Sequence, residues 1–319
     1  MHCELVVPGL FGTTGNPRFA ALELLLARGR RQRAAAQTLE AWLQEAFDLG
    51  EGPFPAGALT LLSLGRDPAD GSWVRADPVH LRLPRDRAVV APAEALSIAP
   101  EEAASLCEAL NRHFAGCEFT PVEPGRWCAR VAEGVHEQSA LQVAGTEPDV
   151  RAQGAPLLNE IQMVLHEHPV NEAREARGEP AVNSVWIWGG GRAPSARSAW
   201  QSVAADDPAV RGAARLAGTR HRALPRSGRE WLDRLPEDGR HLAVLDQLRA
   251  PLALGEEVKE TQARLERDWF TPILAALRTG RIGMVSLHVP DGPHALSFET
   301  IRGDLRRFWR LPKAIERYA

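Results

Sequence analysis

The stretch from His166 to Arg192, HEHPVNEAREARGEPAVNSVWIWGGGR, contains side chains that could bind an anion. Asn171 and Arg174 are three positions apart, so on a helix they face the same side and could hold an oxyanion together. Arg192 follows three glycines and could bind the same anion. The alternatives are that Asn171 caps a helix, because Pro169 interrupts the preceding one, and that Arg192 is an ordinary surface arginine.

Zinc and nucleotide sites are poorly supported in this stretch. His166 and His168 are two positions apart, so on a helix they point in different directions and are expected to be solvated at a helix end. The glycines 189–191 follow a strand, but neither GxGxxG nor GxxxxGK[ST] is present. The helix that would place its free N–H groups against a phosphate is also missing.

Catalytic groups are sparse elsewhere in the chain. No GxSxG segment or Cys/His signature marks an activated nucleophile. Metal-assisted phosphoryl chemistry needs Asp and His clustered at strand ends, and the predicted strand ends offer Asp246, His288 and Asp291 one at a time. These three residues are the remaining candidates for metal ligands.

The elements that must position these groups alternate between helix and strand. Strands are expected at 2–7, 183–188, 241–246 and 281–289, with helices at 17–27, 34–47, 203–217 and 258–277. Residues 59–64 fit a strand or a short helix. Between them, strand pairs at 77–92, with a turn at Pro84–Asp86, and at 117–131 flank a helix at 97–114, and a further helix spans 155–166. This order predicts an α/β core with a partly parallel sheet and an α+β insert.

The bulk composition is that of a soluble, two-domain protein of 319 residues with 44% hydrophobic and 25% charged residues. The net charge of −3 gives no support for nonspecific binding to nucleic acid. Neither a membrane helix nor a signal peptide is predicted, so no membrane partner is expected. Four widely spaced cysteines favour reduced thiols and a cytoplasmic location.

Against this background, the stretch 169–192 resembles a motif of archaeal-type, cofactor-independent phosphoglycerate mutases. That motif reads hPxNxxRxxxGxxPAN, then a hydrophobic strand, then RGxGR. Other segments follow in the family's order: LLSLGRDP, Arg75-Ala76-Asp77, SIAPEEAASLCEALN and VRGAARLAG. The chain is also similar to a bacterial branch, the RpfE-type regulatory proteins.

The resemblance implies membership of the alkaline phosphatase superfamily. Its fold is an α/β core with a mixed, mostly parallel sheet, helices on both faces and an inserted α+β lid domain. On this chain it implies a core at 1–75 and 182–319, with the lid at 76–181. It also implies phosphate transfer through a serine held by two divalent metal ions, such as manganese or zinc.

The resemblance also identifies groups that this chain lacks. The family's nucleophilic serine and the aspartate after it align with Ala56 and Gly57, and its first Asp-Gly aligns with Pro8-Gly9. Of its later Asp-His pair, only His288 is present. Serine-based transfer is therefore expected to be absent, and no metal cofactor is expected.

Positions that match the family's substrate-binding motifs are better preserved. The leading hypothesis is a catalytically degenerate phosphoglycerate-mutase-like protein that binds a small phosphorylated or carboxylated ligand in a regulatory role, with a possible protein partner. The residues expected to bind this ligand are Arg75, Asn171, Arg174 and Arg192.

Two alternatives remain open from the sequence. One is an active, metal-dependent phosphomutase or phosphatase with a relocated ligand set that includes His288, Asp291 and Asp246. The other is a protein–protein interaction module, for which Trp186 and Trp188 would have to be exposed on one strand face. The competing expectation for these tryptophans is that they fill the interior between core and lid.

Overall fold

The computed structural model describes residues 1–12, 18–69, 71–82, 89–130, 138–144, 155–236, 238–291 and 294–319. The chain divides into two compact units. The first unit comprises Met1–Leu49, Ala196–Leu252 and Glu256–Ala319, and the second comprises Gly50–Ser195 with Ala253–Gly255. The second unit is therefore an insert between two parts of the first.

The insert begins earlier and ends later than the expected bounds of 76 and 181. The reason is that β3 (Trp73–Arg82) and β7 (Ser184–Gly191) pair with each other inside the second unit. The helix α3 (Ala56–Ser63) packs against both strands. The residues before 76 and after 181 that form α3, the start of β3 and β7 therefore belong to the insert, because they build its sheet and pack on it.

The first unit is built on a mixed sheet of seven strands in the order β2-β12-β11-β1-β10-β8-β9. Five neighbouring strands run parallel, and β12 and β2 are added antiparallel at one edge. The strands are β1 (His2–Val6), β2 (Arg30–Ala34), β8 (Ser202–Ala204), β9 (Arg220–Arg222), β10 (Arg240–Val244), β11 (Met284–Val289) and β12 (Ala295–Ile301).

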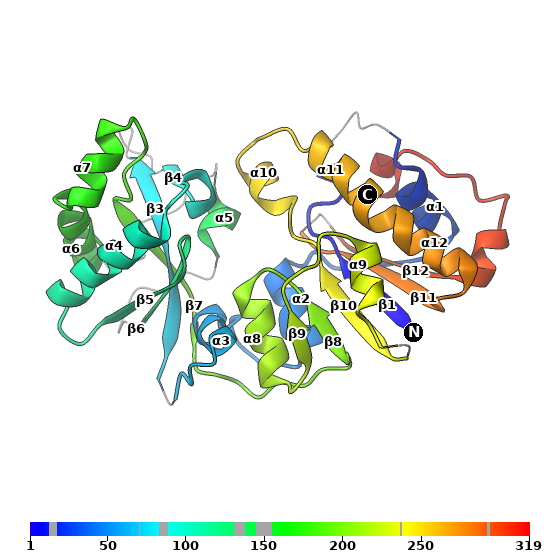
Figure 1. The fold of residues 1–319 in the computed structure, drawn as a ribbon, viewed down its shortest axis with the longest axis horizontal. Helices are drawn as coiled ribbons and strands as arrows, with labels where there is room; N and C mark the ends of the chain where they lie inside the picture. The colour runs from blue at the N-terminus through cyan, green and yellow to red at the C-terminus, as the bar shows by residue number, and fades with distance from the viewer. Residues whose placement is uncertain are drawn as a thin grey trace. The chain divides into compact units, whose positions relative to one another are not determined.

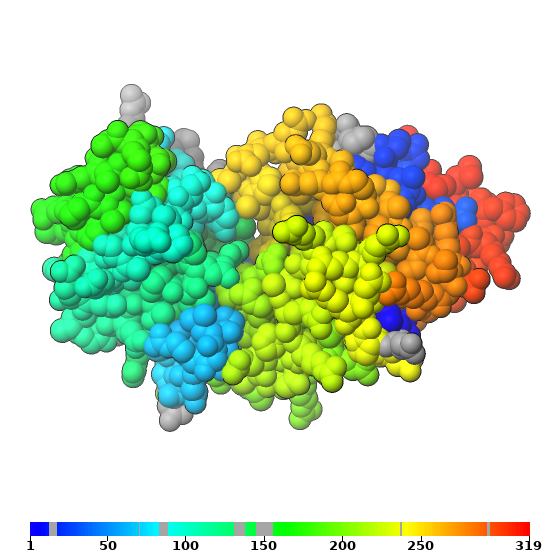
Figure 2. All heavy atoms as spheres, viewed as in Figure 1, coloured from blue at the N-terminus to red at the C-terminus, as the bar shows by residue number. Residues whose placement is uncertain are grey.

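Helices cover both faces of this sheet. On one face, α1 (Ala20–Arg28), α9 (Gly228–Asp233) and α12 (Thr271–Thr279) enclose a core with Cys3 and Leu5 of β1. In this layer α1 lies against β12 and α12 against β11 (Figure 1). In Figure 2, α12 forms part of the outer surface (orange). On the opposite face, Trp42 of α2 (Leu39–Ala46) lies against His288. The mostly parallel sheet with helices on both faces confirms the α/β core expected from sequence.

A π-helical turn interrupts the long helix predicted at 258–277. The helix consists of α11 (Lys259–Leu265), the π segment Glu266–Phe270 and α12. Its Trp269 and Phe270 side chains are buried in the core of the first unit. Such π turns widen a helix by one residue and often lie at functional sites.

The second unit is an antiparallel sheet with helices on each face. Its strands are β3, β4 (Val89–Ala91), β5 (Glu118–Glu123), β6 (Arg126–Arg130) and β7. One core contains residues of α4 (Pro100–His113) and α6 (Ala155–His166), with α7 (Pro169–Ala176) beside α4. The other core contains residues of α3 and α5 (Ala140–Val143). The expected α+β insert is present.

Several local predictions are corrected. The expected helix at 34–47 is the end of β2 followed by α2. Of residues 59–64, for which a strand or a short helix was expected, 59–63 are helical, within α3. The three glycines at 189–191, expected to follow the strand, belong to β7 instead. The turn predicted at Pro84–Asp86 lies outside the described residues.

The remaining short elements connect these layers. They are α8 (Pro208–Leu216), α10 (Arg249–Ala253) and the 3-10 turns Ala93–Ala95, Arg302–Arg306 and Ile315–Tyr318. Across the described parts of the chain, we find no helix with the length and apolar character needed to span a membrane.

Candidate functional site

The carboxyl edge of the parallel strands in the first unit carries an ion-pair cluster. Asp246 follows β10 and Asp291 follows β11, and both strands run parallel to β1. Arg249 Nη2 donates to Glu40 Oε1 at 2.8 Å, and Arg249 Nε lies 3.3 Å from Asp291 Oδ2. Burial alone lowers the pKa of Arg249, but these carboxylates outweigh burial and raise it. A guanidinium group therefore neutralises the acids at this edge.

Asp291 is held by a second contact from the same region. Its Oδ1 accepts a hydrogen bond from the Leu39 backbone N–H at 2.8 Å, at the start of α2. Its backbone has φ of +63°, which is unusual for a residue other than glycine. Burial raises the pKa of Asp291, and Arg249 opposes this effect. Both carboxylate oxygens are thus committed to protein partners.

His288 belongs to a different cluster from the two aspartates. Its ring centroid lies 5.2 Å from that of Trp42, and its Nε2 lies 3.4 Å from Glu4 Oε2. Glu4 also accepts a 2.8 Å hydrogen bond from Arg240 Nε. The distance from His288 Nε2 to Glu4 Oε2 is that of an ion pair, but the two groups are not aligned as a hydrogen bond. Among the described residues this buried nitrogen has no hydrogen-bond partner.

These residues do not fit a two-metal centre. The described residues contain no group of three or more His, Cys, Asp or Glu side chains that could hold a metal ion. Of the candidates, Asp291 is bound by a cation and a helix N–H, and His288 faces Glu4. The donor set therefore lacks the clustered, free oxygen and nitrogen ligands that such a centre needs.

The buried Glu4 makes stability depend on acid pH. Burial by itself raises the pKa of Glu4, but contacts with His288 and Arg240 outweigh it and lower the pKa to about 2, from an ordinary 4.5. A lowered carboxyl pKa stabilises the fold fully above the ordinary value, and this stabilisation is lost as the pH falls through the lowered one. We expect Glu4→Gln to lower the free energy of unfolding by about 2–3 kcal/mol at pH 7.

The measurement is denaturant unfolding of both proteins from pH 7 to pH 2. Their stabilities should converge between pH 4.5 and 2, the ordinary and lowered pKa values of Glu4. Glu118→Gln is the control, because its ion pair with Arg66 is exposed and is worth at most about 1 kcal/mol. A constant difference at every pH would contradict the assignment to Glu4.

In the second unit, Arg174 is a structural residue. Its side chain is 0% exposed. Its Nε donates to the Pro180 carbonyl at 2.9 Å, its Nη1 to Glu102 Oε2 at 2.6 Å, and its Nη2 to the Leu96 carbonyl. These internal contacts give no support to the anion-binding role predicted for Arg174.

Asn171 is likewise satisfied inside the second unit. Its Nδ2 donates to the carbonyls of Leu165 and Val182 at 2.7 and 2.9 Å, and its Oδ1 accepts from Val182 N–H at 2.8 Å. It therefore ties α6 to the strand β7 through the residues that precede that strand. The expected oxyanion fork with Arg174 does not form, and Asn171 is not a helix cap, because His168 caps α7.

Arg75 and Arg192 complete the predicted anion site but are not equivalent. Arg75 is 3% exposed, donates through Nε to Asp77 Oδ1 at 2.9 Å and lies over the Trp188 ring at 5.5 Å. Trp188 Nε1 donates to the other oxygen of Asp77 at 2.7 Å. Arg192 is exposed after β7. Of the four residues predicted to bind the anion, Arg192 alone is exposed.

The position expected for the nucleophile is filled by packing. Ala56 is the first residue of α3 and is 0% exposed, in a core with Trp186 and Trp188. Gly189, with φ of +59°, approaches so closely that an added Cβ would lie 2.6 Å from the Ala56 Cβ. A hydroxyl group at position 56 would thus face packed side chains.

The adjacent Gly57 lies directly against β3. An added Cβ would lie 2.4–2.6 Å from backbone atoms of Trp73 and Val74, which cannot move without breaking the strand. We expect Gly57→Ala to lower the free energy of unfolding by about 1–3 kcal/mol through overpacking, as measured by thermal and urea unfolding.

Gly303→Ala is the matched control, because its methyl group would meet only Ile301 Cδ1, at 3.9 Å. Equal stability of the two variants would show that α3 does not pack on β3 as described.

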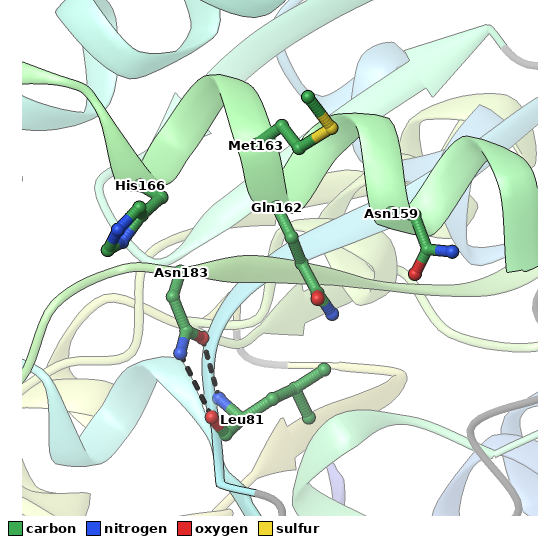
Figure 3. A pocket seen from close by; sticks show the side chains of 6 residues that line it. All are labelled: Leu81, Asn159, Gln162, Met163, His166 and Asn183. Atoms are coloured by element: carbon green, nitrogen blue, oxygen red, sulfur yellow. Dashed lines mark hydrogen bonds between the residues drawn. The ribbon is translucent and has the colours of Figure 1, made fainter.

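The two histidines of the opening stretch are separated. Burial lowers the pKa of His168, whose Nδ1 accepts from the Val170 N–H at 3.2 Å as the cap of α7. It is buried rather than solvated, contrary to expectation. His166 is exposed and lines a cavity of about 430 Å³ with Asn159, Gln162 and Asn183 (Figure 3). Among the described residues, the lining of that cavity contains amide groups and no Asp, Glu, Lys or Arg.

The tryptophans considered for a partner surface are interior. Trp186 is 1% and Trp188 is 6% exposed, and both belong to a core within the second unit. They therefore give no support to an interaction module, and both pack inside the insert. The pair Arg249 and Glu40 was missed from sequence, since an arginine three residues after an aspartate carries no distinctive signal.

Comparisons with known proteins give a fold but no family. No protein-family model matches this chain, and no curated protein matches it. The PH0037 protein from Pyrococcus horikoshii is similar in structure, with a TM-score of 0.56 at 11% identity, over 94% of this chain and 87% of that one. A cofactor-independent phosphoglycerate mutase from Thermoplasma acidophilum aligns over 100% and 94% of the chains, with a TM-score of 0.47 at 16% identity.

Proposed function

We propose that this chain is a phosphoglycerate-mutase-like protein that has lost phosphoryl-transfer chemistry and binds a small phosphorylated or carboxylated ligand in a regulatory role. The motif resemblance at 169–192 and the α/β core with its antiparallel insert support the first part. The alkaline-phosphatase-like identity of the core, the RpfE-type relationship and a cytoplasmic location are parts of the same proposal.

One observation carries the loss of catalysis. At the strand ends where metal-dependent phosphoryl transfer needs free carboxylates, Arg249 is ion-paired with Glu40 and Asp291. A guanidinium group supplies positive charge without open coordination positions, so it can neutralise acids but cannot activate a nucleophile as a divalent ion does.

The nucleophile position supports the same conclusion independently. Ala56 has no hydroxyl group and lies in a packed core. In the family's chemistry the attacking group must be exposed to substrate and activated by a nearby base or metal. Restoring activity would therefore require more than one substitution.

The test combines metal analysis with turnover measurements on the purified full chain. We expect no stoichiometric manganese or zinc, and no phosphomutase or phosphatase turnover after these metals are added. Metal at one equivalent, with turnover that His288→Ala abolishes, would overturn this proposal and favour the active enzyme. Arg197→Ala, an exposed arginine far along the chain from β11, is the control for nonspecific loss.

A further inference from the structure

A second cavity, which lies in the first unit, is found beside the carboxyl end of β10. Its volume is about 210 Å³. Gln247, three residues after the end of that strand, lies in its wall, together with Arg226, which follows β9. In α/β sheets, ligands bind outside the carboxyl ends of the parallel strands. The position of this cavity is therefore typical of a ligand site.

Another part of the lining comes from the interrupted helix. Thr261 and Arg264 belong to α11, and Asp268 and Trp269 belong to the π segment Glu266–Phe270. The extra residue of a π turn changes the direction of the side chains that follow it, and such turns are often retained at functional sites. The buried Trp269 fixes this wall against the core.

The charge of the cavity favours an anion. Arg226 and Arg264 both line it, and among the described residues the guanidinium group of Arg226 has no partner. Arg264 donates to the Thr261 hydroxyl, at 3.0 Å, and to no other group in the described parts of the chain. The acidic residue Asp268 is neutralised by Arg267, with contacts of 2.8 and 2.9 Å. Two arginines are thus available for a carboxylate or phosphate group.

A neutral polar atom adds a second requirement. The side-chain oxygen of Gln247 is buried and makes no hydrogen bond among the described residues. A buried acceptor without a donor destabilises the protein, and a ligand hydroxyl group would supply that donor. At 210 Å³, the cavity is smaller than the roughly 300–1,000 Å³ of drug-sized sites, so the ligand is small.

We propose that this cavity, defined by Arg226, Gln247 and Arg264, binds a small hydroxylated acid, with the arginines on its phosphate or carboxylate and Gln247 on its hydroxyl group. The inference rests on the proposed ligand-binding function, and it moves the ligand from the predicted anion grip of the second unit to the first. A phosphate and a carboxylate group would both bind the two arginines, so the experiment compares these two anions directly.

The test is isothermal titration of the full chain with four probes: sn-glycerol 3-phosphate, inorganic phosphate, glycerate and propionate. We expect one hydroxylated probe to bind at least 10-fold more tightly than its counterpart without the hydroxyl group. Arg226→Ala and Arg264→Ala should each weaken that binding by 10-fold or more. Gln247→Leu should remove the difference between hydroxylated and plain probes. Tighter binding of sn-glycerol 3-phosphate would identify the anion as a phosphate, and tighter binding of glycerate would identify it as a carboxylate.

Arg229→Ala is the matched control, because this exposed arginine of α9 lies outside the cavity lining. Binding of none of the probes would overturn the proposal, as would binding that is unchanged in both arginine variants. In the latter case, loss of binding in Arg192→Ala would return the ligand to the second unit and leave the proposed function intact. Metal-dependent turnover would instead overturn the proposed function and leave the cavity assignment standing.

Discussion

Replacing Arg249 with methionine is expected to lower the free energy of unfolding at pH 7 by about 3–5 kcal/mol. The side chains of Arg249 and Glu40 are 14% and 13% exposed, so the ion pair is largely removed from solvent. Methionine retains most of the apolar volume but leaves Glu40 and Asp291 without their counter-charge. Denaturant unfolding of both proteins gives the difference.

The pH dependence of this loss identifies its cause. Burial already raises the pKa of Asp291, and removing Arg249 takes away the group that opposes this rise. A raised carboxyl pKa means that the folded state binds the proton more readily, so acid stabilises the variant relative to neutral pH. The deficit of Arg249→Met should therefore shrink between pH 7 and pH 4, where protonated acids need no counter-charge.

Arg281→Met is the control for this experiment. Its ion pair with Asp233 has a similar distance of 2.9 Å, but the side chains are 44% and 57% exposed. Exposed pairs are worth at most about 1 kcal/mol. If Arg249→Met were as mild as this control, Arg249 would not be the counter-charge that stabilises Glu40 and Asp291 in the folded protein.

The second large effect is expected for Arg174→Ala in the insert. Alanine would leave the carbonyls of Leu96 and Pro180 without the donors that Arg174 supplies. It would also leave a cavity, because the Arg174 side chain is 0% exposed. We expect a loss of about 3–5 kcal/mol, measured by thermal and denaturant unfolding. Arg174→Lys should recover only part of it, because an ammonium group cannot reach three divergent acceptors as the planar fork does.

Arg192→Ala separates a structural role from a ligand-binding role. This exposed arginine follows β7 in the same motif, and its loss should not change stability. The proposed structural role of Arg174 predicts that Arg174→Ala is unstable with or without ligand. A fully stable Arg174→Ala protein that has lost affinity for glycerate or sn-glycerol 3-phosphate would restore the anion grip inferred from sequence.

The sequence by itself determined the class of fold and most of its elements. Periodic apolar residues identified α4 and α6, and the alternation of buried strands with helices predicted the parallel core. These signals are local, because a helix or strand is specified by spacing along the chain. The boundary of β2 and α2 was missed, because RRQRA has no apolar alternation and pairs only at a sheet edge.

The tertiary structure alone decided what the candidate residues do. The Asn171 and Arg174 spacing is the same whether the side chains face a ligand or the interior, and only packing showed that their donors meet backbone carbonyls. Arg249 gained its role because β10 and β11 end at one edge of the sheet. Sequence spacing fixes which face a side chain takes within its own element, but the partner on that face comes from long-range pairing, which no local pattern encodes.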